Sequence, residues 1–79
     1  MNRGVENAEL PIRFKNFYEA QFHGLVRTAQ LLVGDGGDPE ALVQECLMRV
    51  HAKFHAISNP YAYARATLVN LCRRQHRRA

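Results

Sequence analysis

The last twelve residues, LVNLCRRQHRRA, hold the chain's densest group of side chains that could bind a partner. Four of them are arginines, Arg73, Arg74, Arg77 and Arg78, and no acidic residue lies near them. Guanidinium groups pair with phosphate oxygens in planar, two-pronged contacts. This run therefore predicts either a surface that binds a polyanion or the solvated end of a helix.

The charge of the whole chain is divided in the same direction. Residues 1–48 carry four basic and seven acidic side chains, a net charge of −3, whereas residues 49–79 carry seven basic side chains and no acid, a net charge of +7. A basic half of this kind is typical of a nucleic-acid surface, although a merely solvated face has the same composition.

The arginines share a helix face with other polar groups. Asn59-Pro60 is typical of a helix cap followed by a first-turn proline, so a helix is expected from there to the end of the chain. At about 100° per residue its core side would hold Tyr61, Ala64, Leu68, Leu71 and Cys72. The opposite side would hold Tyr63, Ala66, Thr67, Asn70, Arg73, Arg74 and Arg77. Guanidiniums neutralise phosphates, an amide reads base edges and an aromatic ring stacks on bases, so this face favours nucleic acid.

A second helix is expected to begin at Asp38-Pro39-Glu40, which combines a cap, a first-turn proline and an acid favoured by the helix dipole. Its apolar face would hold Leu42, Val43, Cys46, Leu47, Val50 and Phe54. Its opposite face would hold Ala41, Gln44, Glu45 and Met48, with His51 and His55 further along. An exposed methionine beside polar groups is common at protein contacts, but single exposed apolar residues are also normal, so this face is open to either interpretation.

These helices need a third to complete a core. Helical spacing of apolar residues predicts it over Phe14, Tyr18, Phe22, Leu25, Val26, Ala29, Leu32 and Val33. GDGG at 34–37 would end it, and residues 1–10 are expected to be a flexible lead-in. The predicted fold is all-α, a small antiparallel bundle of three main helices over residues 11–79. Cys46 and Cys72 are expected to be reduced core thiols in a cytoplasmic protein, and no run is apolar enough to span a membrane.

Three segments together resemble region 2 of the bacterial sigma factors, in particular the short extracytoplasmic-function group. They are FYEAQFHGLVRTAQLLVGD (17–35), DPEALVQECLMRVHAKF (38–54) and NPYAYARATLVNLCRRQHRR (59–78). The resemblance implies that the second helix docks on the clamp helices of the RNA polymerase β′ subunit. It also implies that the connector and third helix bind the non-template strand of the minus-ten promoter element and help to open the duplex.

By position, the resemblance assigns polymerase contacts to Glu40, Gln44, Glu45 and Met48. It assigns DNA contacts, together with the outward face, to Phe54, His55, Ser58, Asn59, Tyr63, Thr67, Asn70, Arg73, Arg74 and Arg77. Ala41 departs from the family, which usually has an aspartate there, and its loss could weaken docking or move it onto Glu40 and Glu45. The family also has a C-terminal helix-turn-helix domain, so we expect this chain to be a fragment of a longer protein. An anti-sigma factor is a further expected partner.

The sequence disfavours three other classes of function. The chain places no serine or cysteine nucleophile beside a base and an orienting acid. We therefore expect that the protein is not an enzyme and that it binds no cofactor. A metal site could use His51 with His55 and Cys72 with His76, but these pairs are expected to face different ways, so no metal is predicted. A pure protein-interaction module would not require the arginine face, and that feature distinguishes it from a promoter-binding domain.

Overall fold

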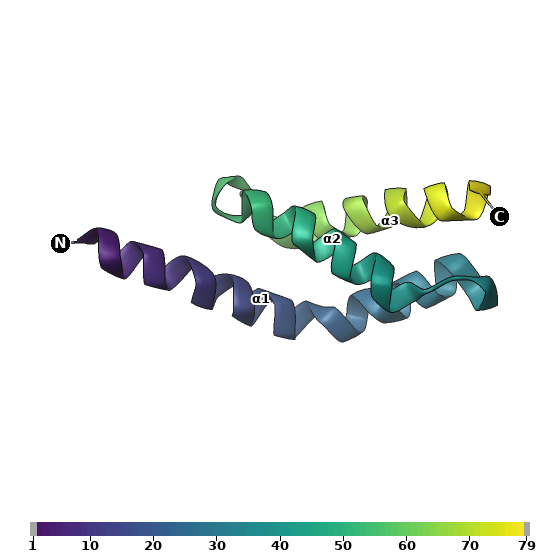
Figure 1. The fold of residues 1–79 in the computed structure, drawn as a ribbon, viewed down its shortest axis with the longest axis horizontal. Helices are drawn as coiled ribbons and strands as arrows, with labels where there is room; N and C mark the ends of the chain where they lie inside the picture. The colour runs from purple at the N-terminus through teal and green to yellow at the C-terminus, as the bar shows by residue number, and fades with distance from the viewer. Residues whose placement is uncertain (1, 79) are drawn as a thin grey trace.

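Three helices make up the fold of the computed structural model, which describes the backbone of residues 2–78 and the side chains of residues 11–75. Helix α1 spans Asn2–Val33, α2 spans Pro39–Lys53 and α3 spans Pro60–Arg78, with short 3-10 turns at η1 (Gly34–Gly36) and η2 (Phe54–Ala56). Helix α2 runs antiparallel to both α1 and α3 (Figure 1). The predicted all-α bundle is confirmed, and the described residues include no strand.

Helix α1 begins earlier than the sequence predicted. The apolar spacing starts at Phe14, yet the backbone is helical from Asn2 and continues through Pro11. Residues 1–10 are polar and lack the apolar spacing of a helix, so the prediction for them was a lead-in and not part of the helix. This first part of α1 projects beyond the other helices in Figure 1. The flexibility of residues 1–10, and a domain boundary at residue 11, stay predictions.

Both predicted helix caps are present. Asp38 Oδ1 accepts a hydrogen bond from the Ala41 amide at 3.2 Å, and Asn59 Oδ1 accepts one from the Ala62 amide at 3.1 Å. Each cap satisfies one of the backbone N–H groups that a helix start leaves without a partner. Gly34 has a φ of 67° and ends α1, as glycine commonly does in this left-handed conformation. Local sequence signals thus determine where α2 and α3 begin.

The core lies where the three helices meet. Its buried residues are Leu25, Ala29, Leu42, Val43, Cys46, Leu47, Val50, Ala64, Leu68, Leu71 and Cys72. The prediction for Leu32 was wrong, because its side chain is 44% exposed. The Gly37 backbone lies against the neighbouring Val33 side chain, so the turn after α1 covers Val33 and leaves Leu32 uncovered. The expectation that both cysteines are free core thiols is confirmed.

An aromatic cluster holds the turn between α2 and α3. Phe54 of η2 packs edge-on against Phe14 with ring centroids 5.3 Å apart, and it meets Phe17 at 5.5 Å. Phe14 also meets the His51 ring of α2 at 4.7 Å. Such edge-to-face pairs contribute about 0.5–1.5 kcal/mol each beyond the area they bury. The cluster therefore fixes the start of the connector, from which residues 55–59 lead into α3.

Candidate nucleic-acid interface

The outer face of α3 presents polar and basic groups to solvent. Asn70, Arg73 and Arg74 are exposed, as the helical spacing predicted, and the small Ala66 lies among them. Asn70 precedes Arg73 and Arg74 by three and four residues, so the three side chains occupy adjacent turns of one surface. The side chain of Arg77, the remaining predicted arginine of this face, lies outside the described residues. The described part of the face therefore joins one amide with two guanidiniums.

Tyr63 and Thr67 lie at the border of this face rather than on it. Both are half-buried, and Tyr63 packs against the core cluster. The prediction that they point outward needs correction, because Tyr63 packs against the core and Thr67, about 40° from it around the helix axis, is half-buried as well. Each side chain is partly accessible, so only part of it can contact a ligand.

The connector supplies two exposed side chains whose polar groups are not used in a helix cap. His55 and Ser58 are exposed, whereas Phe54 is half-buried within the aromatic cluster. Asn59 is exposed, but its side-chain oxygen already accepts the cap hydrogen bond from Ala62. Of these four predicted DNA contacts, His55 and Ser58 are thus free to meet a ligand, while Phe54 and Asn59 hold the connector in place.

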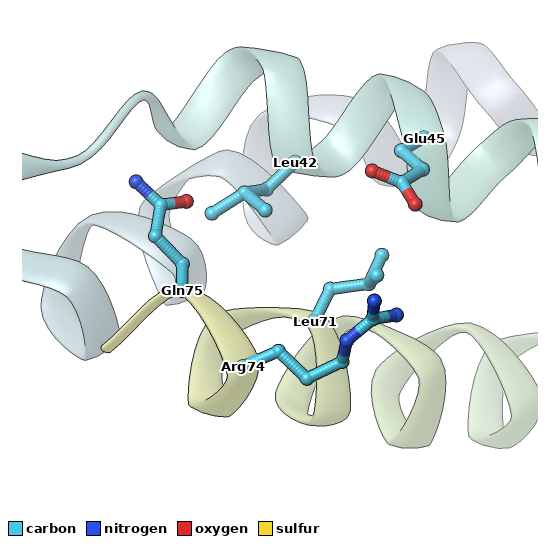
Figure 2. A pocket seen from close by; sticks show the side chains of 5 residues that line it. All are labelled: Leu42, Glu45, Leu71, Arg74 and Gln75. Carbon is cyan, nitrogen blue, oxygen red and sulfur yellow. The ribbon is translucent and has the colours of Figure 1, made fainter. Parts of the chain in front are cut away.

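Arg74 lies beside a cavity between α2 and α3. The cavity has a volume of about 450 Å³ and is lined by Leu42, Glu45, Leu71, Arg74 and Gln75. Figure 2 shows Glu45 reaching down from α2 toward Leu71 and Arg74 on α3. A carboxylate and a guanidinium therefore border the same cavity, together with one leucine from each helix. The sequence assigned Glu45 to the polymerase surface and Arg74 to the DNA surface. It did not predict that these two surfaces adjoin.

The outer face of α2 is exposed as predicted. Glu40, Gln44, Glu45 and Met48 are all accessible, and Met48 is 73% exposed. Glu45 accepts a hydrogen bond from Arg49 Nη2 at 2.8 Å, and both side chains of this ion pair are half exposed. An exposed i,i+4 pair of this kind contributes only about 0.3–0.5 kcal/mol, so a partner can displace it at little cost.

Met48 also borders a second, more apolar hollow. This hollow of about 310 Å³ lies between α1 and α2 and is lined by Phe14, Tyr18, Leu47, Met48 and His51. Sequence reasoning placed Phe14 and Tyr18 in the core and therefore missed it. Half-buried aromatic rings beside an exposed methionine are frequent at protein contacts. The outer face of α2 and this hollow together form a surface suited to a protein partner.

The two thiols are not suited to chemistry. Cys46 Sγ donates to the Ala64 carbonyl at 3.2 Å, and burial, with a smaller effect of Cys72, raises its pKa to about 11. Burial also raises the pKa of Cys72. A reactive cysteine needs a lowered pKa and access to solvent, and these two have neither. Both thiols therefore act as small core side chains.

The two histidine and cysteine pairs with metal-ligand spacing do not form a metal site in the described part of the chain. Among the described side chains, no three His, Cys, Asp or Glu residues lie close enough to hold a metal ion. His51 packs against Phe14, and Cys72 is buried in the core. The His76 side chain lies outside the described residues.

Tyr61 and Arg65 are the main features that sequence reasoning missed. Tyr61 was predicted to face the core but is 47% exposed, and the Arg65 guanidinium lies over its ring. A helical wheel gives the angle of a residue about the helix axis. It does not show whether a neighbouring helix covers that turn, and no helix covers the first turn of α3 at Tyr61. The i,i+4 spacing of an aromatic and an arginine was the available signal.

These observations define an all-α bundle with two distinct surfaces. One is the basic, polar face of α3, and the other is the acidic face of α2 with the apolar hollow beside it. A comparison with protein-family models finds a match to Sigma-70 region 2 over residues 17–79. The chain therefore belongs to the sigma-70 region 2 family. Comparisons with curated proteins and with solved structures gave no significant match.

Membership of this family assigns the chain a role in transcription initiation and promoter recognition. Its partners are the RNA polymerase core and promoter DNA. The matched range includes all of α2, η2 and α3, and thus both surfaces described above. Within the part of the chain that the structure describes, no helix is long and apolar enough to cross a membrane.

Proposed function

We propose that this domain belongs to an extracytoplasmic-function sigma factor and docks on the clamp helices of the polymerase β′ subunit through α2. The docking residues are Glu40, Gln44, Glu45 and Met48. The observation that supports this is the exposure of all four along one side of α2. The weak Glu45–Arg49 pair leaves the Glu45 carboxylate available to a basic partner side chain. Because polymerase acts in the cytoplasm, the domain acts there too.

The promoter-facing part of the proposal concerns α3 and the connector. Asn70 would contact a base of the non-template strand of the minus-ten element, while Arg73, Arg74 and Arg77, which follow it along α3, neutralise neighbouring phosphates. An amide offers both a donor and an acceptor and can discriminate between bases, whereas a guanidinium on phosphate cannot. Sequence choice would therefore come from Asn70 and the accessible connector side chains, and affinity from the arginines.

Duplex opening would use the connector. Unstacking one base costs a few kcal/mol, which a protein pocket and an aromatic surface can offset. His55 and Ser58 would line the position of a flipped base, and the exposed edges of Phe54, Tyr63 and Thr67 would flank it. The aromatic packing of Phe54 supports this role because it holds the connector without any bound DNA, so little ordering is required at the moment of binding.

A selection experiment tests the proposal without knowledge of the promoter. The 79-residue chain, mixed with a β′ clamp-helix fragment, is presented with random single-stranded DNA. We expect enrichment of one short motif, and we expect the enrichment to disappear with Asn70→Ala but not with Gln30→Ala, an exposed amide on α1. A library that stays random after selection would contradict promoter reading by this domain.

A second function is favoured by the hollow beside Met48. Its half-buried aromatic rings and exposed methionine would suit an apolar side chain of an anti-sigma factor, which could cover α2 and exclude polymerase. This would make the domain a regulated one without changing its promoter contacts. A domain used only for such protein contacts would not require the basic face of α3, which supports the promoter proposal as the primary one.

A further inference from the structure

Met48 carries the most accessible sulfur atom in the part of the chain that the structure describes. The sequence holds two cysteines and two methionines. Both cysteines are buried in the core, whereas Met48 is 73% exposed on α2. The side chain of Met1 lies outside the described residues. An oxidant in solution therefore reaches Met48 far more readily than either thiol.

The two thiols are also protected by their protonation state. The thiolate, and not the thiol, is the form that reacts with an oxidant. Burial, with a smaller effect of Cys72, raises the pKa of Cys46 to about 11, and burial raises the pKa of Cys72 as well. Both groups therefore keep their protons at neutral pH. A thioether has no proton to lose, so access to solvent decides how readily Met48 reacts.

Met48 lies where the exposed side of α2 meets the hollow between α1 and α2. Gln44 and Glu45 precede it by one turn, so the three side chains share the proposed docking surface. Met48 also lines the hollow together with the half-buried rings of Phe14 and Tyr18. A protein that covers this surface would therefore remove the thioether from water and enclose it beside aromatic rings.

We propose that Met48 is a site of reversible oxidation, at which a peroxide converts the thioether to the sulfoxide and thereby weakens docking on the polymerase clamp. A lone pair of the sulfur attacks one oxygen of hydrogen peroxide, the S–O bond forms as the O–O bond breaks, and the second oxygen leaves as water with both protons. The sulfur loses two electrons and the peroxide gains them. Methionine sulfoxide reductases reverse such a change. This inference rests on the proposed docking through α2.

The sulfoxide oxygen is polar and accepts hydrogen bonds, which changes what a partner must bury. In the free domain water solvates this oxygen because Met48 is exposed, so the fold should be unaffected. In the complex the partner displaces that water, and a polar oxygen then occupies a contact that fits a thioether. Burying a polar group without a compensating hydrogen bond is unfavourable, and we expect binding to weaken by about 5- to 100-fold.

The test measures the affinity of the 79-residue chain for a labelled β′ clamp-helix fragment by fluorescence anisotropy. The chain alone is treated with hydrogen peroxide, catalase removes the excess, and peptide mass spectrometry gives the fraction of Met48 that has gained one oxygen atom. Wild type should lose affinity on oxidation and regain it after treatment with the two reductases, one for each sulfoxide epimer. Met48→Leu is compared with itself before and after peroxide, and this ratio should not change.

A second variant and a stability measurement make the result independent of the oxidant. Met48→Gln places a polar group at this position, and it should bind the clamp fragment more weakly than Met48→Leu without peroxide. Urea unfolding and circular dichroism of the oxidised wild-type chain should match those of the untreated chain. A loss of helicity on oxidation would overturn the inference, because the effect would then be on the fold.

The outcomes separate this inference from the function on which it rests. Undiminished binding by a chain that mass spectrometry shows to be oxidised at Met48 would overturn the inference and leave docking through α2 intact. An equal loss after peroxide in wild type and Met48→Leu would also overturn it, since another group would be responsible. Failure of the untreated wild-type chain to bind the clamp fragment would overturn both.

Discussion

Glu45 of α2 and Arg74 of α3 border the same cavity from opposite helices, although each belongs to a different proposed surface (Figure 2). Among the described side chains the ion pair of Glu45 is with Arg49 and not with Arg74. Arg74 is therefore an exposed cation near a carboxylate, whereas Arg73 projects from the outer side of α3. The two neighbouring arginines should respond differently to the same ligand.

The first prediction concerns this difference. Arg73→Ala should lower the slope of log affinity for single-stranded DNA against log salt concentration by about 0.7, the value for one neutralised phosphate. Arg74→Ala should lower it by less, because the Glu45 carboxylate nearby disfavours the approach of a phosphate. Anisotropy titrations at several salt concentrations measure both slopes.

Removing the negative charge of Glu45 while keeping its size provides the matched control for that prediction. In a Glu45→Gln background, Arg74→Ala should lower the slope of log affinity against log salt concentration by as much as Arg73→Ala does. Identical slopes for Arg73→Ala and Arg74→Ala in the native background would mean that the shared cavity has no electrostatic effect on DNA binding.

The second prediction concerns polymerase docking. Gln44→Ala combined with Glu45→Ala should abolish capture of a β′ clamp-helix fragment, since it removes two of the three polar side chains proposed to dock. Glu19→Ala combined with Gln30→Ala changes the same residue types on exposed positions of α1 and should leave capture intact. Circular dichroism should show equal helicity for both. Undiminished capture by the α2 variant would show that another face meets the clamp. Ala41→Asp, which restores the acid usual in the family, should tighten capture.

The sequence predicted well those features that depend on neighbours along the chain. Asp38-Pro39 and Asn59-Pro60 marked the starts of α2 and α3, and the hydrogen bonds of both caps are present. The buried face of α2 was also predicted, because a short helix between two others is covered along most of its length. The helical repeat also predicted the exposed positions of Asn70, Arg73 and Arg74 on the basic face of α3.

Features that depend on how far one helix covers another were not predictable in this way. Tyr61 has the angle of a core residue but lies on an uncovered turn, and Leu32 is in the same position at the end of α1. The cavity shared by Glu45 and Arg74 depends on the separation of α2 and α3, which no periodicity contains. These misses all occur at helix ends or between helices.

The third prediction concerns stability at high pH. Burial raises the pKa of Cys46 from an ordinary value of 9.0 to about 11, so the folded state retains the thiol proton when the unfolded state has lost it. The contribution is fully present below pH 9 and is lost as pH rises toward 11, a total of about 2–3 kcal/mol. Denaturant unfolding of wild type and Cys46→Ala over this range measures it. The variant should be less stable at pH 8 but lose stability less steeply above pH 9, and parallel curves would contradict the assignment.

The fourth prediction uses one chemical change at two glycines. Gly24 lies within α1 and a Cβ there would meet nothing within 4 Å, so Gly24→Ala should stabilise the domain by about 0.5–1 kcal/mol. At Gly37 a Cβ would lie 2.5 Å from Val33 Cγ2 and 3.2 Å from Gln75 Nε2, so Gly37→Ala should destabilise by about 1–3 kcal/mol. Urea unfolding gives both values. A stabilising Gly37→Ala would mean that the turn does not pack on Val33 and α3.

The last prediction distinguishes reading DNA from merely holding it. Asn70 is exposed three residues before Arg73, so phosphates held by the arginines would place its amide near a base edge. Asn70→Ala should therefore cost about 1–3 kcal/mol on a preferred non-template strand and much less on a scrambled strand, because only the preferred strand matches the amide's donor and acceptor. The salt slope should stay unchanged, since no charge is lost. Anisotropy on both strands at two salt concentrations gives all four quantities. Equal losses on the two strands would show that Asn70 contributes to affinity without discriminating bases, and α3 would then position the strand while the connector alone reads it.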